Sequence, residues 1–144
     1  GPPAKKWSQN TRFMIGFQTN FIKKDEEESM LAVREHYHHN TKILDLSGRF
    51  DVNSKIGLEV AILGAKEMGC QHIVLNFSHI TWIDSMGLGQ LFLWYHNMRL
   101  NHVHLSIVSP QPTVKNLLEA AHLSDIVPIY HSEKEAVEAH ISAC

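Results

Sequence analysis

Apolar stretches alternate with helical repeats between residues 72 and 130, and this alternation constrains the fold more than any other feature of the sequence. The predicted strands are 72–77, 103–108 and 126–130, and the predicted helices between them span about 85–100 and 113–121. The first two stretches are short and rich in branched apolar residues, as is typical of central strands covered on both faces. Strands that alternate with helices form βαβ units, in which helices pack against a parallel sheet. The sequence therefore predicts an α/β fold.

Residues 31–71 add two strands and a helix to this pattern. Strands at 31–37 and 42–46 are joined by a turn short enough for an antiparallel pair. After the connection 47–52, either Asn53 or Ser54 can cap a helix that ends at Gly69. The apolar positions of that helix are Ile56, Leu58, Val60, Ile62 and Leu63.

A short helix capped by Ser132, with Glu135 completing a capping box, follows the last strand. We therefore expect one α/β domain over residues 30–144, with a mixed sheet of about five strands and helices packed against it.

Residues 1–29 do not show the strand and helix pattern of this domain. Their Phe13, Phe17 and Phe21 recur every four residues, so the segment is either a poorly ordered extension or an amphipathic helix that contacts the domain or a second copy.

Composition narrows the range of functions. A length of 144 residues fits one domain, and a net charge of -2 gives no argument for direct nucleic-acid binding. Two cysteines, Cys70 and Cys144, cannot build a disulfide framework, which favours a reducing compartment and makes the cytoplasm the expected location. No apolar run approaches the roughly 20 residues needed to cross a bilayer, so we expect no membrane insertion.

Asp84 and Ser85 stand where the predicted strand 72–77 has ended and the helix 85–100 begins. The first N–H groups of a helix lack partners within it, so Asp or Ser serves as a cap and an anion is favoured there. Gly87 and Gly89 would leave room for a partner's backbone or a phosphate. Because Asp51 also follows a strand, and function gathers at the carboxyl ends of parallel strands, we expect Asp51 to lie near Asp84.

The sequence gives little support for a metal site or for enzyme activity. The eleven histidines include the groups His36-x-His38-His39 and His102-x-His104, the latter expected on one face of a strand. Neither group has the Cys or acidic companions of a zinc site, so no metal or cofactor is predicted. The stretch 83–87 lacks the first Gly of a serine hydrolase nucleophile elbow, so no catalytic residue and no enzyme activity are predicted.

The stretch 74–89 resembles the signature of STAS domains, the fold of anti-sigma factor antagonists. The likeness continues through 105–110 and 126–130 and covers about residues 30–141, with Asp84-Ser85-x-Gly87-Leu88-Gly89 as its most specific part. The resemblance implies that Ser85 is the phosphorylated residue. Met86 stands where many members carry a second Ser or Thr. It also implies a partner-binding surface made of Asp51, Asp84, Ser85, Met86, Gly87 and Leu88.

The resemblance implies two alternative functions. In the first, the protein is a switch whose unphosphorylated form binds an anti-sigma factor serine kinase and so releases the sigma factor; phosphorylation of Ser85 ends binding, and a PP2C-type phosphatase is the second expected partner. In the second, it is a STAS-type scaffold or sensor module of a signalling assembly or transporter, in which Ser85 is only a helix cap.

Overall fold

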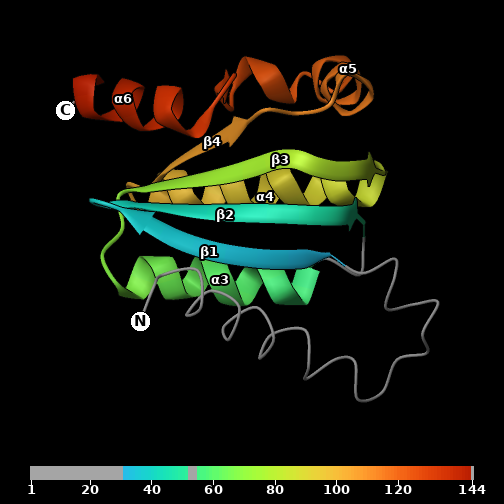
Figure 1. Cartoon of the computed structure of the whole chain (residues 1–144). Coiled ribbons are helices and arrows are strands. Elements are labelled where there is room, and N and C mark those ends of the chain that lie inside the picture. The colour runs from blue at the N-terminus through green and yellow to red at the C-terminus, as the bar shows by residue number, and fades with distance from the viewer. Residues whose placement is uncertain (1–30, 52–54, 144) are drawn as a thin grey trace.

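The computed structural model describes residues 31–51 and 55–143, which build a five-stranded sheet with helices on both faces (Figure 1). The strands are β1 (Ala32–His38), β2 (Thr41–Phe50), β3 (His72–Ile83), β4 (His104–Val108) and β5 (Ile129–Tyr130). The helices are α3 (Lys55–Glu67), α4 (Ser85–Leu100), α5 (Pro112–Ala120), the 3₁₀ turn η2 (Leu123–Asp125) and α6 (Glu133–Ala143). Strand order follows the chain, with β1 antiparallel to β2 and all later pairs parallel. The predicted mixed α/β sheet is confirmed.

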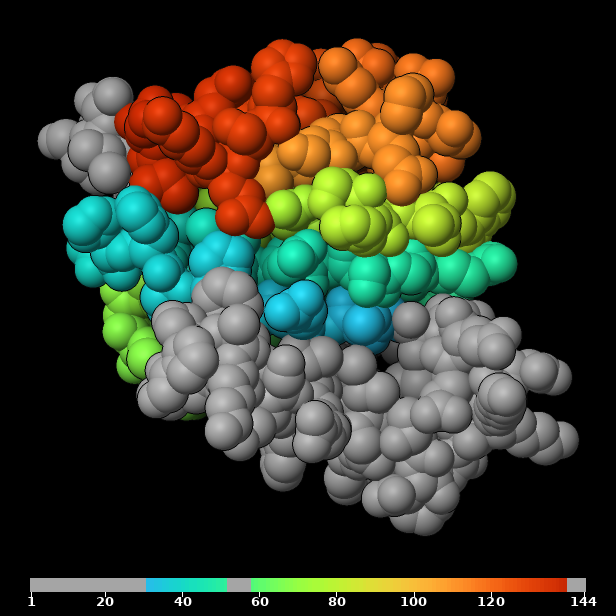
Figure 2. All heavy atoms as spheres, in the orientation of Figure 1, coloured from blue at the N-terminus to red at the C-terminus, as the bar shows by residue number. Residues whose placement is uncertain are grey.

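The central strand β3 is buried from both sides. Its Ile73, Leu75 and Phe77 enter a large core with α3, α4 and α5, whereas Val74 enters a smaller cluster with residues of α6. This period of two is what a strand imposes on its side chains. Helix α6 covers only part of the sheet face on which it packs. Parts of β2 and β3 remain visible at the surface beside it (Figure 2).

Strands β2 and β3 run further than predicted, to Phe50 and Ile83 in place of residues 46 and 77. The extra residues pair with each other past register shifts between Asp45 and Ser47 and between Gly48 and Arg49. Such irregularities interrupt the alternation of apolar residues, which is why these segments resemble connections in the sequence. Strand β5 is shorter than predicted, since residues 126 and 127 follow the 3₁₀ turn instead.

The inner face of α3 includes only part of the apolar positions listed from the sequence. In α3, Leu58 and Ile62 are buried as expected, but Val60 and Leu63 are exposed. The remaining inner positions are Ala61 and Ala65, whose small side chains let the helix lie close to the sheet. In α4 the buried residues are Gly87, Leu91, Trp94 and Met98, while Phe92 is exposed.

The helix ends follow the sequence signals. Gly69 adopts a left-handed φ of 77°, and the Cys70 N–H donates to the Ala65 carbonyl over 3.0 Å, which closes α3 as predicted. The Ser132 hydroxyl accepts the Glu135 N–H over 3.1 Å at the start of α6.

Some of the predictions fall on residues that the structure does not describe. These are the caps Asn53 and Ser54, the Ile56 side chain and the extension 1–29. Among the helices that are described, none is long and apolar enough to cross a bilayer.

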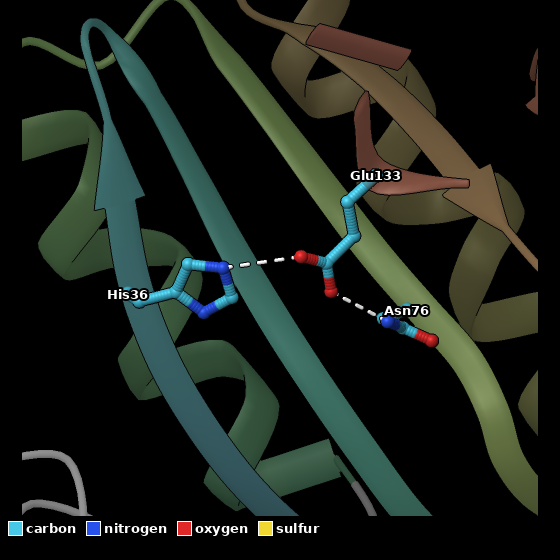
Figure 3. A network of polar contacts seen from close by, with 3 residues as sticks. All are labelled: His36, Asn76 and Glu133. Atoms are coloured by element: carbon cyan, nitrogen blue, oxygen red, sulfur yellow. Dashed lines mark hydrogen bonds and ion pairs between the residues drawn. The ribbon is translucent and has the colours of Figure 1, made fainter. Parts of the chain in front are cut away.

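One carboxylate ties α6 to two strands of the sheet (Figure 3). Glu133 Oε1 accepts from His36 Nε2 of β1 over 3.2 Å, and Glu133 Oε2 accepts from Asn76 Nδ2 of β3 over 2.5 Å. The hydrogen bond from His36 is the main influence that lowers the pKa of Glu133, against burial, which raises it. On β2, burial and the nearby Glu133 charge raise the pKa of Asp45. The four side chains therefore form one electrostatic group beneath the start of α6.

Candidate functional site at the start of helix α4

Asp84 is the residue that caps α4. Its backbone is extended, with φ of -108° and ψ of -177°, and its carboxylate accepts the Gly87 N–H over 2.8 Å. Its carbonyl accepts the Leu88 N–H over 2.9 Å, the first bond of the helix. Ser85 is the first helical residue and is exposed. The interpretation of Ser85 as the cap is therefore wrong, and its hydroxyl is not engaged in capping.

The end of β2 lies directly beside this turn. Phe50 pairs with Ile83, and the Phe50 carbonyl accepts the Asp84 N–H over 3.4 Å. Asp51, the next residue of the chain, is half-buried and lies with its carboxylate 3.9 Å from Arg49 Nε. The prediction that Asp51 and Asp84 lie near each other is thus confirmed, and its cause is the parallel pairing of β2 with β3 up to their last residues.

Gly87 has a structural role that the sequence did not reveal. A Cβ at this position would lie 2.4 Å from the Phe50 carbonyl oxygen and 2.8 Å from its ring atom Cδ1. Gly87 is buried, so the absence of its side chain lets α4 approach β2 and does not create room for a partner, contrary to expectation. Gly89 differs, because it is exposed and nothing lies within 4 Å of its Cβ position.

The six predicted surface residues are therefore not equally accessible. Ser85 and Met86 are exposed, Asp51, Asp84 and Leu88 are half-buried, and Gly87 is buried. Leu88 packs its side chain against the main core. Of the six, only Ser85 and Met86 are exposed to a partner.

Two residues that sequence reasoning did not single out form the rim of the turn. Arg49 of β2 and Trp82 of β3 are register neighbours, and the guanidinium carbon lies 5.7 Å from the centre of the Trp82 ring. This distance suits a cation–π contact. Trp82 is 44% exposed, so an aromatic surface and a cation stand next to the Asp84–Ser85 turn. The pairing is invisible in the sequence, because it depends on the register of the extended strands.

An exposed apolar stripe runs along α4 from the same turn. Met86, Leu93 and Leu100 are 60%, 63% and 69% exposed. Their spacing of seven residues, two helical turns, puts them on one face. We call these three residues the outer stripe of α4. The spacing was readable in the sequence, but nothing there indicated that this face points away from the core.

The histidine groups are dispersed over the fold. His36 binds Glu133, and the His38 and His39 rings contact each other edge to face at 4.6 Å. His102 adopts a left-handed φ of 61° in the turn after α4, so it does not share a strand face with His104 as expected. Among the residues that the structure describes, no three His, Cys, Asp or Glu side chains come together in a way that could hold a metal ion.

Comparison with known proteins decides the family. A model of the STAS domain matches residues 31–136. The chain belongs to the STAS domain family. An anti-sigma F factor antagonist of Paenibacillus polymyxa is 28% identical in an alignment of 111 residues, and the match covers 74% of this chain and 92% of that protein.

Solved STAS structures agree with the fold. The anti-sigma factor antagonist SpoIIAA in its unphosphorylated form is 20% identical, has a TM-score of 0.66, and the match covers 77% of this chain and 97% of that one. The phosphorylated form of SpoIIAA, from Bacillus, is 19% identical with a TM-score of 0.60, over 75% of this chain and 98% of that one. The STAS chain described here has the fold of anti-sigma factor antagonists.

Proposed function

We propose that this STAS protein is a phosphorylatable protein-interaction switch of the anti-sigma factor antagonist type. Its unphosphorylated form binds an anti-sigma factor serine kinase, the kinase transfers a phosphoryl group to Ser85, and a PP2C-type phosphatase removes it. The protein acts in the cytoplasm by binding, without catalysis of its own and without direct contact to nucleic acid. The observation that carries the proposal is the exposed Ser85 hydroxyl at a helix start that Asp84 already caps.

The chemistry of the turn suits an acceptor hydroxyl. Because Asp84 satisfies the Gly87 N–H, adding a phosphate to Ser85 breaks no capping bond. A phosphoserine carries about -1.5 to -2 charges, which a helix N-terminus tolerates through its dipole and its unpaired N–H groups. The fold can therefore accept the phosphate without rearrangement, and the change stays local to the surface.

The surroundings of Ser85 explain how a phosphate would end binding. The proposed docking surface consists of Ser85, the outer stripe of α4 beginning at Met86, Asp51, and the rim formed by Arg49 and Trp82. A partner that covers this apolar surface must desolvate whatever stands beside it. A phosphate next to the Asp84 carboxylate would then be buried against apolar groups or an acidic surface, which is strongly unfavourable.

The first experiment asks whether Ser85 is the acceptor. The protein is incubated with the host's serine kinase of the anti-sigma factor type and Mg-ATP, and its intact mass is measured. Wild type should gain one phosphate and Ser85→Ala none. Thr81→Ala is the matched control, because Thr81 is an exposed hydroxyl residue close in sequence, and it should be phosphorylated like wild type. Phosphate on Ser85→Ala would refute the assignment.

The second experiment measures binding by titration calorimetry. Ser85→Ala should bind the kinase persistently. Ser85→Asp places a second carboxylate beside Asp84 and should weaken binding by about a hundredfold or more. Equal affinity of wild type, its phosphorylated form and both variants would refute the switch and leave the scaffold or sensor function, for which the outer stripe of α4 would still serve as a docking surface.

A further inference from the structure

A concave site lies on the outer edge of β4, at the end of the sheet opposite Ser85. Strand β5 pairs only with Ile107 and Val108, so among the described strands none covers the edge of β4 before these residues. A cavity with a volume of about 610 Å³ occupies this place. The cavity lies near the first residues of β3 and β4, His72 and His104, which are paired in the sheet. Pockets of about 300–1,000 Å³ are typical of small-ligand sites.

Among the residues that the structure describes, those that line the cavity include one arginine and several polar side chains, and none of them is acidic. Arg99, His102 and His104 line it near the start of β4, and the two tyrosines Tyr95 and Tyr130 add hydroxyl groups. Arg99 is always charged, and its planar guanidinium matches the two oxygens of a carboxylate. This part of the cavity therefore favours an anion.

Buried hydrogen-bonding groups also face the cavity. His72 and Ser106 line it although they are only 2% and 3% exposed, and His72 Nε2 lies 2.6 Å from Ser106 Oγ. The N–H of Ile107 donates to the Pro128 carbonyl across the edge toward β5. Since N–H groups of a strand alternate in direction, the N–H of Leu105 points toward the same edge, where the cavity lies. These groups are fixed by the sheet and need no rearrangement to meet a ligand.

The rest of the wall is apolar. Val103 and Leu105 line it at the start of β4, and the other apolar lining residues come from the loop before β5 and from α6. Those residues are Ile126, Pro128 and Ala139. Pro128 and Tyr130 flank Ile129, which pairs with Ile107, so the apolar part extends along β4 away from the cationic start. The cavity thus has Arg99 near the start of β4 and apolar side chains that continue along β4 to Pro128, which is an arrangement that an amphiphilic anion requires.

We propose that this cavity binds a small organic carboxylate with an apolar body. The carboxylate lies against Arg99, with His102, His104 and the Leu105 N–H as further donors, and the apolar body lies against Val103, Leu105, Ile126 and Pro128. The site shares no residue with the turn around Ser85, so it does not depend on the switch. Because its walls come from β3, α4, β4, β5 and α6, a bound ligand would stabilise the native state through contacts with these five elements.

The test uses the full chain and sodium octanoate as the probe. Binding is followed by ¹H–¹⁵N NMR at pH 7, with sodium chloride added to keep the ionic strength constant. We expect saturable shifts below about 10 mM octanoate that include the Leu105 amide and the residues around His102. The neutral analogue 1-octanol is compared with octanoate at about 2 mM, where both dissolve, and should give much smaller shifts of the same amides, because it lacks the charge that Arg99 recognises.

Two matched variants separate a carboxylate site from nonspecific binding. Arg99→Gln should weaken octanoate binding about tenfold or more. Arg34→Gln removes the same charge from an exposed position on β1, outside the cavity, and should leave the affinity unchanged. The proposal is overturned by a lack of saturation in wild type, by octanol binding as tightly as octanoate, or by equal effects of the two variants. Phosphorylation of Ser85 is measured separately and has no bearing on this result.

Discussion

The carboxylate of Glu133 offers the sharpest test of how α6 is held on the sheet. We choose Glu133→Gln, which keeps the size of the side chain and removes its charge. A hydrogen bond to a charged group contributes about 1.5–3 kcal/mol when buried. Glutamine keeps one acceptor oxygen, and Glu133 is 32% exposed, so solvent already weakens the pair with His36. We therefore expect a loss of about 1 kcal/mol and a Tm lower by about 3 °C at neutral pH.

The pH dependence of this loss has a definite sign. The pKa of Glu133 is lowered in the folded state, chiefly by the His36 hydrogen bond, so its contribution is present above the unfolded pKa, about 4.3. The contribution disappears as the pH falls through the lower folded pKa. The difference in unfolding free energy between wild type and Glu133→Gln, measured by urea denaturation, should therefore shrink steadily between about pH 5 and pH 3.

A second readout distinguishes charge from packing. The Glu133 carboxylate is one cause of the raised pKa of Asp45, after burial. In Glu133→Gln, the pKa of Asp45, followed by carboxyl ¹³C NMR, should move back toward its ordinary value without reaching it, because the burial remains. Glu138→Gln is the control, since this exposed residue of α6 forms a solvent-exposed pair with Lys134 at 3.9 Å and its substitution should change neither quantity. Equal stability of the two variants, with the Asp45 titration unchanged in both, would refute the reasoning.

Three further predictions concern the turn and the domain boundary. Gly87→Ala should lower the free energy of unfolding in urea by about 2 kcal/mol or more, since its Cβ would lie 2.4 Å from a backbone oxygen. Gly89→Ala, whose Cβ would lie in open space, should instead stabilise the helix by about 0.5–1 kcal/mol. Asp84→Ala should lose about 1 kcal/mol of capping, against at most a few tenths for Ser85→Ala, and equal losses would contradict the cap assignment. Removal of residues 1–29 should leave a cooperative thermal transition, and its loss would show that the segment belongs to the core.

Local signals in the sequence were enough to predict much of this fold. The bounds of α4, the stop at Gly69 and the cap at Ser132 each depend on residues within one helical turn, and all three agree with the structure. The proximity of Asp51 and Asp84 also followed, because it needs only that two neighbouring parallel strands end at the same edge.

Features that depend on pairing between distant segments could not be predicted in this way. The bridge from His36 to Glu133 joins residues that are 97 positions apart, and neither residue stands in a recognisable motif. The extension of β3 to Ile83 is equally hidden, since it exists only because β2 continues past its irregular pairs to Phe50.

Gly87 shows how a correct motif can carry an incorrect physical explanation. In the sequence, glycines after Asp84 and Ser85 suggested space for a partner, because a helix start with small residues is a common place for one to approach. In the structure the same residue is buried against the Phe50 carbonyl, so any side chain would push α4 away from β2. Since Asp84 caps α4 and also donates its N–H to that carbonyl, such a displacement would shift the turn that presents Ser85. Gly87 therefore bears on partner binding through the position of Ser85, although a partner cannot reach it.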